Sequence, residues 1–140
     1  MEQLLPFVTH HWPLVGIFVA ALSYLMYLEL GPQLGDIQRL SPVEVTTLLN
    51  RQGAQVVDLR NLEQFKSGHI LNALHIDSPK SADVVLKRTK DKRRPIILVS
   101  DTHKTVMDFG AILREAGYET VVSLGGGMRA WREAKMPLVN

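Results

Sequence analysis

The 140-residue chain contains no cysteine, and this absence excludes several kinds of site. Without thiols the chain cannot form a disulfide framework or a cysteine metal site. The hydrophobic fraction of 46% and the charged fraction of 21% are typical of a protein with a globular core. The length allows one ordinary domain together with a short additional segment. We expect no metal ion and no cofactor.

Basic residues are absent from the first 38 positions, so all 16 lysines and arginines lie from Arg39 onward. Within this part, residues 12–28 carry no charge, and extension to Leu30 adds only Glu29. At about 1.5 Å per residue, such a segment makes a helix of about 26–28 Å, close to the thickness of a bilayer core. The sequence therefore predicts one transmembrane helix over about residues 12–30.

From residue 36 onward, short apolar runs alternate with amphipathic segments. The apolar runs predict strands over residues 36–40, 55–58, 73–76, 96–99 and 120–124. The amphipathic segments predict helices over residues 41–49, 61–68, 81–90, 105–117 and 128–134. Ser41, Pro42 and Glu44 form a capping-box signal at the first of these helices. This alternation predicts an α/β domain with a parallel sheet covered by helices on both faces.

The apolar N-terminal segment has three interpretations. A buried helix of a soluble domain is disfavoured, because the strands and helices of residues 37–140 form a complete domain without it. A cleaved signal peptide would lack its charged n-region and a convincing cleavage site. We favour a single-pass anchor within residues 1–30, followed by a linker over residues 31–36. The excess of lysine and arginine after the anchor places the C-terminal domain in the cytoplasm, at the inner membrane if the source is bacterial.

Two motifs of the C-terminal part resemble the rhodanese-like (sulfurtransferase) domain family. The first reads VVDLRNLEQFKSGHI over residues 56–70, and the second reads VVSLGGGMRAW over residues 121–131. Either motif alone is moderately specific, and the combination is specific. The resemblance covers roughly residues 37–139. It implies a central parallel sheet flanked by helices, in agreement with the element pattern.

In that family, an active loop of the form Cys-x-x-x-x-Arg follows a strand, and its thiolate carries sulfane sulfur as a persulfide. The resemblance places this cysteine at Ser100 and the arginine at Thr105. A serine hydroxyl cannot hold a persulfide. We therefore expect no catalytic residue in this degenerate loop, which consists of Ser100, Asp101, Thr102, His103, Lys104 and Thr105.

Other roles for the loop are open. Ser100 and His103 could form a nucleophile and its base, but an orienting carboxylate and an oxyanion hole would also be needed. The backbone amides of a strand–turn–helix junction could bind phosphate or sulfate, although a solvated loop without a ligand is favoured. Asp58 and Arg60 flank the family's pocket, and we interpret them as a buried ion pair that orders neighbouring loops.

Two further features suggest partners. Residues 87–94 contain six basic side chains, which form either a solvated helix end or a contact with anionic lipid worth about 1 kcal/mol per residue. No aromatic residue is interleaved with this run, so nucleic acid is not an expected partner. Gly16 and Ala20 are spaced for weak packing of two membrane helices into a homo-oligomer.

These features favour a membrane-anchored, catalytically inactive rhodanese-like domain that acts as a binding, scaffold or regulatory module at the cytoplasmic face. Its protein partner is not identified by the sequence, and membrane proteins are candidates. Two alternatives stay open. One is a sulfurtransferase-related enzyme with a nucleophile other than cysteine or with a partner's thiol, and the other is a small-anion sensor that uses the loop at Ser100.

Overall fold

The computed structural model describes residues 10–140, without the side chains of residues 29–35. The chain divides after Asp36 into an N-terminal unit and a C-terminal unit of Ile37–Asn140. Each unit is considered by itself. The predicted N-terminal segment begins with residues 1–9, which lie outside the described residues.

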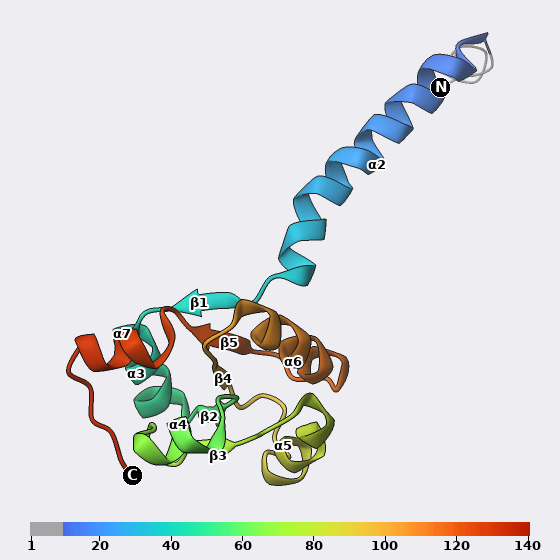
Figure 1. Cartoon of the computed structure of the whole chain (residues 1–140). Coiled ribbons are helices and arrows are strands. Elements are labelled where there is room, and N and C mark those ends of the chain that lie inside the picture. The colour runs from blue at the N-terminus through green and yellow to red at the C-terminus, as the bar shows by residue number, and fades with distance from the viewer. Residues whose placement is uncertain (1–9) are drawn as a thin grey trace. The chain divides into compact units, whose positions relative to one another are not determined.

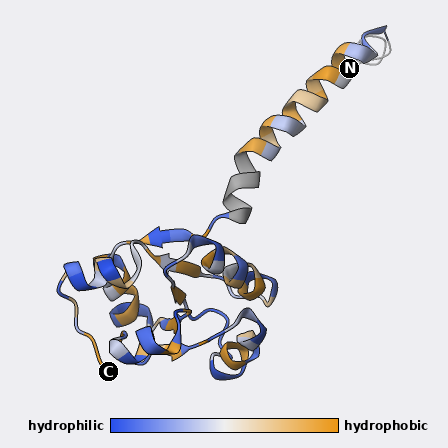
Figure 2. Cartoon of the chain, viewed as in Figure 1, coloured by the Kyte–Doolittle hydropathy of each residue, from blue (hydrophilic) through white to orange (hydrophobic). Residues whose placement is uncertain are grey.

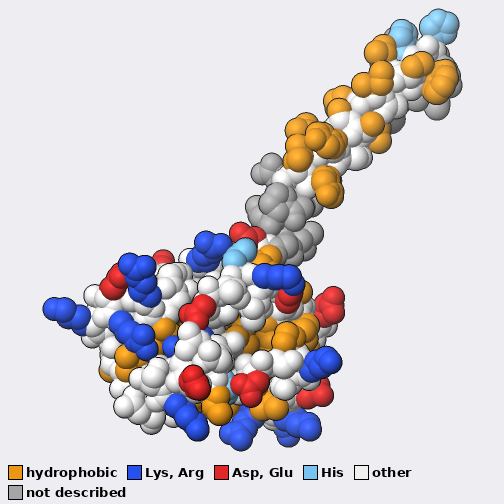
Figure 3. Space-filling model, in the orientation of Figure 1, with side chains coloured by type: hydrophobic (Ala, Val, Ile, Leu, Met, Phe, Trp, Pro, Cys, Tyr) orange, Lys and Arg blue, Asp and Glu red, His pale blue; other side chains and the backbone are white. Residues whose placement is uncertain are grey.

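The N-terminal unit contains helix α2, which spans Trp12–Gly35 (Figure 1). Most of the large side chains in its first 17 residues are exposed, from 48% for Leu28 to 73% for Trp12. Apolar residues predominate along this part of the helix (Figure 2), and orange side chains are seen along its visible face in Figure 3. A helix that is apolar all round is normally covered by protein or lipid, so this surface requires an explanation.

Within residues 10–140, no helix combines the length and the apolarity that a membrane crossing requires. The transmembrane segment over about residues 12–30 therefore stays a prediction. The predicted end of this helix is wrong, because α2 does not break at Gly31 and continues through Pro32 to Gly35. Proline keeps a helical φ and removes one N–H donor, so a helix can continue through it at a local cost.

The C-terminal unit is built on a five-stranded parallel sheet with the order β1-β5-β4-β2-β3. Its strands are β1 (Gln38–Leu40), β2 (Gln55–Asp58), β3 (Leu74–His75), β4 (Ile96–Val99) and β5 (Val121–Leu124). Its helices are α3 (Pro42–Gln52), α4 (Leu62–Ser67), α5 (Ala82–Arg88), α6 (His103–Glu115), α7 (Gly127–Glu133) and the short 3-10 helix η1 (Pro79–Ser81). The predicted α/β class and parallel sheet are confirmed.

Side-chain caps fix where two of these helices begin. The Ser41 hydroxyl accepts from the Glu44 amide at 3.3 Å, and the Ser41 amide donates to the Glu44 carboxylate at 2.7 Å. The Ser41 hydroxyl also donates to the same carboxylate at 2.9 Å. The bond from the Ser41 amide and, to a smaller extent, that from its hydroxyl lower the pKa of Glu44. Asn61 accepts from the Gln64 amide at 2.8 Å at the start of α4. Both caps agree with the sequence signals.

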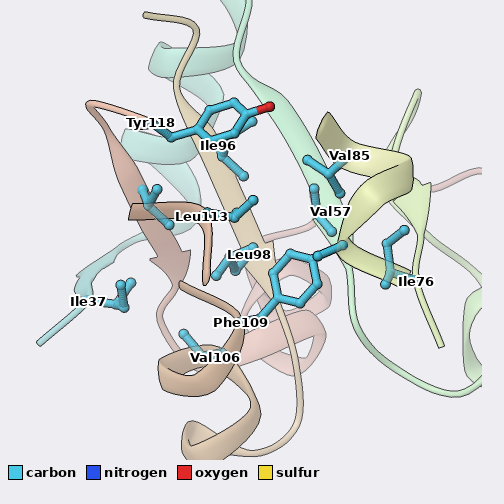
Figure 4. Packing of buried hydrophobic residues seen from close by; sticks show 12 residues of the cluster. Ile37, Val57, Ile76, Val85, Ile96, Leu98, Val106, Phe109, Leu113 and Tyr118 are labelled. Carbon is cyan, nitrogen blue, oxygen red and sulfur yellow. The ribbon is translucent and has the colours of Figure 1, made fainter. Parts of the chain in front are cut away.

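Each face of the sheet is covered by its own hydrophobic core. On one face, α5 and α6 pack over the strands, with Phe109 pointing toward Leu98 and Val57 (Figure 4). On the opposite face, α3 and α7 cover the alternate strand residues, which include Val56, Ile97, Val99, Val122 and Leu124. Because all strands are parallel, their carboxyl ends lie at one edge of the sheet, called here the carboxyl edge. The loops that follow the strands therefore meet at this edge.

Candidate functional site

A cavity of about 330 Å³ lies at the carboxyl edge, between the loop after β4 and the turn after β5. Ser100 follows β4 directly, and α6 begins at His103, two residues earlier than the expected Thr105. The cavity is lined by residues of four elements and their loops: Arg39, Ser100, Asp101, Thr102, His103, Val106, Ser123, Leu124, Gly126, Gly127 and Arg129. This is the location at which parallel α/β sheets commonly bind ligands.

The three hydroxyl groups of the loop form hydrogen bonds within the loop itself. The Ser100 hydroxyl accepts from the Thr102 amide at 3.2 Å, and the hydroxyl oxygens of Thr102 and Thr105 lie 2.6 Å apart. The Asp101 carboxylate accepts from the Gln64 side-chain amide at 2.7 Å, which ties the loop to α4. The Ser100 hydroxyl therefore takes part in the turn itself.

The imidazole of His103 is held by Arg39 from β1. Nη2 of Arg39 lies 2.9 Å from Nδ1 of His103. Because a guanidinium can only donate, Nδ1 acts as the acceptor and the neutral ring carries its hydrogen on Nε2. Among the hydrogen bonds of residues 10–140, none joins His103 to Ser100. The arrangement thus lacks the base contact that a serine nucleophile requires.

Two arginines from outside the loop give the cavity its positive charge. Arg39 belongs to β1 and Arg129 to α7, and both line the cavity with His103. Arg129 also pairs with Glu133 at 3.0 Å on the exposed helix surface. Lys104 does not line the cavity, because its ammonium bonds to Asp108 at 2.7 Å, which raises the pKa of Lys104.

Sequence reasoning missed the roles of Arg39 and Arg129, and a signal in the sequence was present only for Arg129. Arg39 is opposite Ser123 in the parallel register of β1 and β5, which brings it to the carboxyl edge. Arg129 follows the glycine turn, within the second family motif. A prediction of strand order would have placed Arg39, but the order β1-β5 is non-sequential and cannot be read from local patterns.

Asp58 and Arg60 form a buried, bidentate ion pair at the carboxyl edge of the sheet, where β2 ends. Nη2 of Arg60 donates to Oδ2 of Asp58 at 2.7 Å, and Nε donates to Oδ1 at 3.0 Å. The side chain of Arg60 is 3% exposed and that of Asp58 is 1% exposed. Nη2 also donates to the carbonyl of Gly68 at 2.8 Å. Neither residue lines the Ser100 cavity, so the pair joins the end of β2 to the loop after α4.

The histidines near this pair bond to backbone carbonyls. Nδ1 of His69 lies 2.8 Å from the carbonyl oxygen of Phe65, whose ring stacks on the imidazole at 3.8 Å. Nε2 of His75 lies 2.8 Å from the carbonyl oxygen of Arg60. In the part of the chain from residue 10 onward, no cluster of three or more His, Asp or Glu side chains could hold a metal ion.

The glycine turn after β5 packs directly against the Ser100 loop. Gly126 and Gly127 have φ values of 74° and 59°, a conformation that side chains disfavour. A Cβ on Gly127 would lie 3.2 Å from the carbonyl oxygen of Ser100. Trp131 of α7 is only 2% exposed and belongs to the core. The turn is thus a close backbone contact that forms one wall of the cavity.

The basic segment over residues 87–94 has two structural contacts. Lys92 donates to the carbonyl of Ala116, and Nε of Arg94 donates to the carbonyl of Gly53 at 2.5 Å. These two side chains hold neighbouring loops. The remaining basic side chains, those of Lys87, Arg88, Lys90 and Arg93, are exposed.

Comparisons with known proteins agree with the fold. Residues 41–134 match the family model described as rhodanese-like domain. The chain is 28% identical over 141 residues to the uncharacterized protein YibN of Escherichia coli K12, covering 99% of this chain and 98% of YibN. It is 35% identical over 95 residues to thiosulfate sulfurtransferase GlpE of Pseudomonas aeruginosa, covering 68% of this chain and 84% of GlpE.

Solved structures give the same fold. A polysulfide-sulfur transferase homodimer from Wolinella succinogenes superposes with a TM-score of 0.64, at 24% identity, over 84% of this chain and 88% of that chain. The BH2092 protein of Bacillus halodurans superposes with a TM-score of 0.63, at 22% identity, over 84% of this chain and 86% of that chain. These likenesses show the fold alone.

Proposed function

The chain belongs to the rhodanese-like domain family, and from this premise we propose that it is a catalytically inactive binding or scaffold module. The observation that carries the proposal is Ser100, which occupies the position that the resemblance gives to the family's thiolate. Its hydroxyl accepts from the Thr102 amide, and the whole chain has no cysteine to replace it. The strands and helices around the loop are those of the family fold. The domain therefore keeps a surface that a partner can bind, although it lacks a thiolate that could carry sulfur.

The proposal is tested by a sulfurtransferase assay of the purified full chain with thiosulfate and cyanide. GlpE serves as the positive control and a mixture without protein as the blank. Because a hydroxyl cannot form a persulfide, we expect no thiocyanate above the blank. Turnover that Ser100→Ala abolishes would instead support a sulfurtransferase-related enzyme with a nucleophile other than cysteine.

We also propose that α2 attaches the domain to a membrane, with the domain on the cytoplasmic side. The exposed apolar side chains over residues 12–28 support attachment, because apolar surface in water costs about 25 cal/mol per Å². The orientation rests on the lysines and arginines, all of which follow α2 in the sequence. The exposed basic side chains near residues 87–93 could add contacts with anionic lipids.

The absence of native cysteine makes this attachment easy to test. Single cysteines are introduced at Glu2 and at Lys90, and intact cells are treated with a membrane-impermeant maleimide. Labelling of Glu2→Cys alone would support a spanning helix with a cytoplasmic domain. Protection of both positions together with a membrane-bound chain would support attachment without crossing, and recovery of the full chain in the soluble fraction would refute attachment.

The partner is sought by crosslinking the full chain in membranes and comparing it with a form that lacks residues 1–34. If the module acts at a membrane, partners captured by the full chain should be lost from the truncated form. Identical partner sets would mean that the C-terminal domain selects its partners without the helix.

A second candidate function is a small-anion receptor at the Ser100 cavity. The convergence of Arg39, Arg129 and His103 on this cavity supports it, because guanidinium groups bind oxyanions through charge-assisted hydrogen bonds. Thermal shift with phosphate, sulfate and sulfite tests this candidate at constant ionic strength. Stabilisation that Arg129→Gln removes would support a receptor, and no shift at millimolar anion would reject it.

A further inference from the structure

A second cavity, of about 390 Å³, lies near the edge of the sheet at which the strands begin. Gln55 is the first residue of β2, and Arg94 lies two residues before β4. Gln55 and Arg94 both line this cavity. Since they lie where β2 and β4 begin and Ser100 lies where β4 ends, the length of these strands separates the cavity from the Ser100 loop. Its volume falls within the range of small-ligand pockets, about 300–1,000 Å³.

The wall of this amino-edge cavity combines apolar and polar side chains, with somewhat more apolar than polar surface. It includes Leu49 of α3, Ile70 of the loop before β3, and Trp131 of α7. Ile70 and Trp131 belong to the core on the α3 and α7 face, with Leu49 packed against it. Leu71, which also lines the cavity, is 64% exposed. An apolar side chain from outside could therefore extend this core and cover surface that now faces water.

Gln55 supplies a hydrogen-bond acceptor in the same wall. Its side-chain nitrogen donates to the carbonyl of Val56 at 3.0 Å and to the carbonyl of Asn72 at 2.9 Å. These bonds use both amide hydrogens, which fixes the orientation of the group. Within the described part of the chain, no hydrogen bond uses Oε1 of Gln55. This oxygen can accept a hydrogen bond from an N–H donor of a ligand.

Arg94 supplies a cation whose position is fixed by the fold. Its Nε donates to the carbonyl of Gly53 at 2.5 Å, so the terminal nitrogens are available for a second partner. Among the ion pairs found within residues 10–140, none includes Arg94. A half-buried guanidinium without an acidic partner favours a carboxylate as its ligand.

We propose that the amino-edge cavity binds the C-terminal residue of a partner polypeptide that ends in an apolar side chain. Its carboxylate pairs with Arg94, its amide N–H donates to Oε1 of Gln55, and its side chain packs against the apolar wall. A peptide C-terminus combines these three groups in one residue. This site is independent of the function proposed for the Ser100 loop.

The test uses the full chain in lipid nanodiscs and three small probes, with binding followed by NMR at the Trp131 indole and the Gln55 side-chain amide. N-acetyl-leucine carries the carboxylate, the N–H and the apolar side chain. N-acetyl-leucinamide lacks the charge, and N-acetyl-aspartate lacks the apolar side chain. We expect N-acetyl-leucine to bind about tenfold or more tightly than either of the others. Equal binding of the three probes, or no shift at millimolar N-acetyl-leucine, would overturn the proposal.

Two variants locate the carboxylate. Arg94→Gln should weaken binding of N-acetyl-leucine to the level of N-acetyl-leucinamide and leave binding of the latter unchanged. Arg93→Gln is the matched control, because Arg93 is exposed and does not line the cavity, and it should bind as the wild type does. If Arg94→Gln kept full affinity, the carboxylate contact would be refuted. The probe comparison in the wild type decides the proposal even if the Arg94 variant fails to fold.

Discussion

Two regions at the carboxyl edge of the sheet differ sharply in how their polar groups are satisfied. The Asp58–Arg60 pair is buried and bonded on both partners. The loop over residues 100–105 lies largely at the surface, and its hydroxyls bond within the turn. The first region lies in the first of the two motifs that resemble the family, and the second is the loop at which we propose that the chain departs from the family pattern. The contrast predicts that the ion pair contributes more to the stability of the fold than the loop does.

The strongest test of this contrast is Asp58→Asn. The variant leaves the Arg60 guanidinium buried without its counter-charge, so we expect a loss of about 3–5 kcal/mol in the free energy of unfolding. Urea denaturation of the full chain in nanodiscs, followed by tryptophan fluorescence, measures the loss. Trp131 lies in the core of the C-terminal unit and reports on its unfolding. Asp101→Asn is the matched control on the loop and should change stability by no more than about 0.5 kcal/mol. Equal losses for the two variants would abolish the distinction between the regions.

A smaller effect is expected at the contact between the loop and the glycine turn. Gly127→Ala places a Cβ 3.2 Å from the carbonyl oxygen of Ser100 at a φ of 59°, so we expect a loss of about 1–3 kcal/mol. The same denaturation experiment measures it. Gly16→Ala is the control, because nothing lies within 4 Å of its added Cβ in α2, and the C-terminal unit should unfold as in the wild type. An unchanged stability of Gly127→Ala would mean that the loop moves without cost.

Most of the fold was predictable from the sequence because its signals are local. Ser41 and Asn61 mark helix starts through hydrogen bonds to amides three residues later, and the buried strands are short apolar runs. The features that were not predictable depend on contacts between residues that are far apart in the sequence. β3 has only two residues, shorter than its predicted run, because its pairing with β2 ends there. The cation from β1 could not be placed at the candidate site without the register that sets Arg39 opposite Ser123.

The capping box of α3 is intermediate between the buried ion pair and the exposed loop. Ser41 and Glu44 are exposed, but each bonds to the other through its backbone amide and its side chain. Ser41→Ala removes the cap and should cost about 1 kcal/mol. The amide and, to a smaller extent, the hydroxyl of Ser41 donate to the Glu44 carboxylate and lower the pKa of Glu44. Of these two bonds, Ser41→Ala removes only the hydroxyl bond, whose stabilisation is complete above the pKa of the unfolded carboxyl. It is lost as the pH falls through the lower pKa of the folded state. The difference between wild type and Ser41→Ala should therefore shrink in acid, and a difference that grew would refute this assignment.

The smallest change in stability is expected for Ser100→Cys, which tests whether the loop differs from an active one at a single position. The side chain is half-buried and changes by one atom, so stability should alter by no more than about 0.5 kcal/mol. The variant carries the only thiol of the chain, and its alkylation by iodoacetamide can be followed without interference. We expect alkylation but no thiocyanate production. The loop has Thr105 at the position to which the resemblance assigns the family's arginine, and Asp101 adds a negative charge that opposes anionic thiosulfate. Turnover close to that of GlpE would contradict this expectation, because the loop would then need only a thiol at position 100 to transfer sulfur.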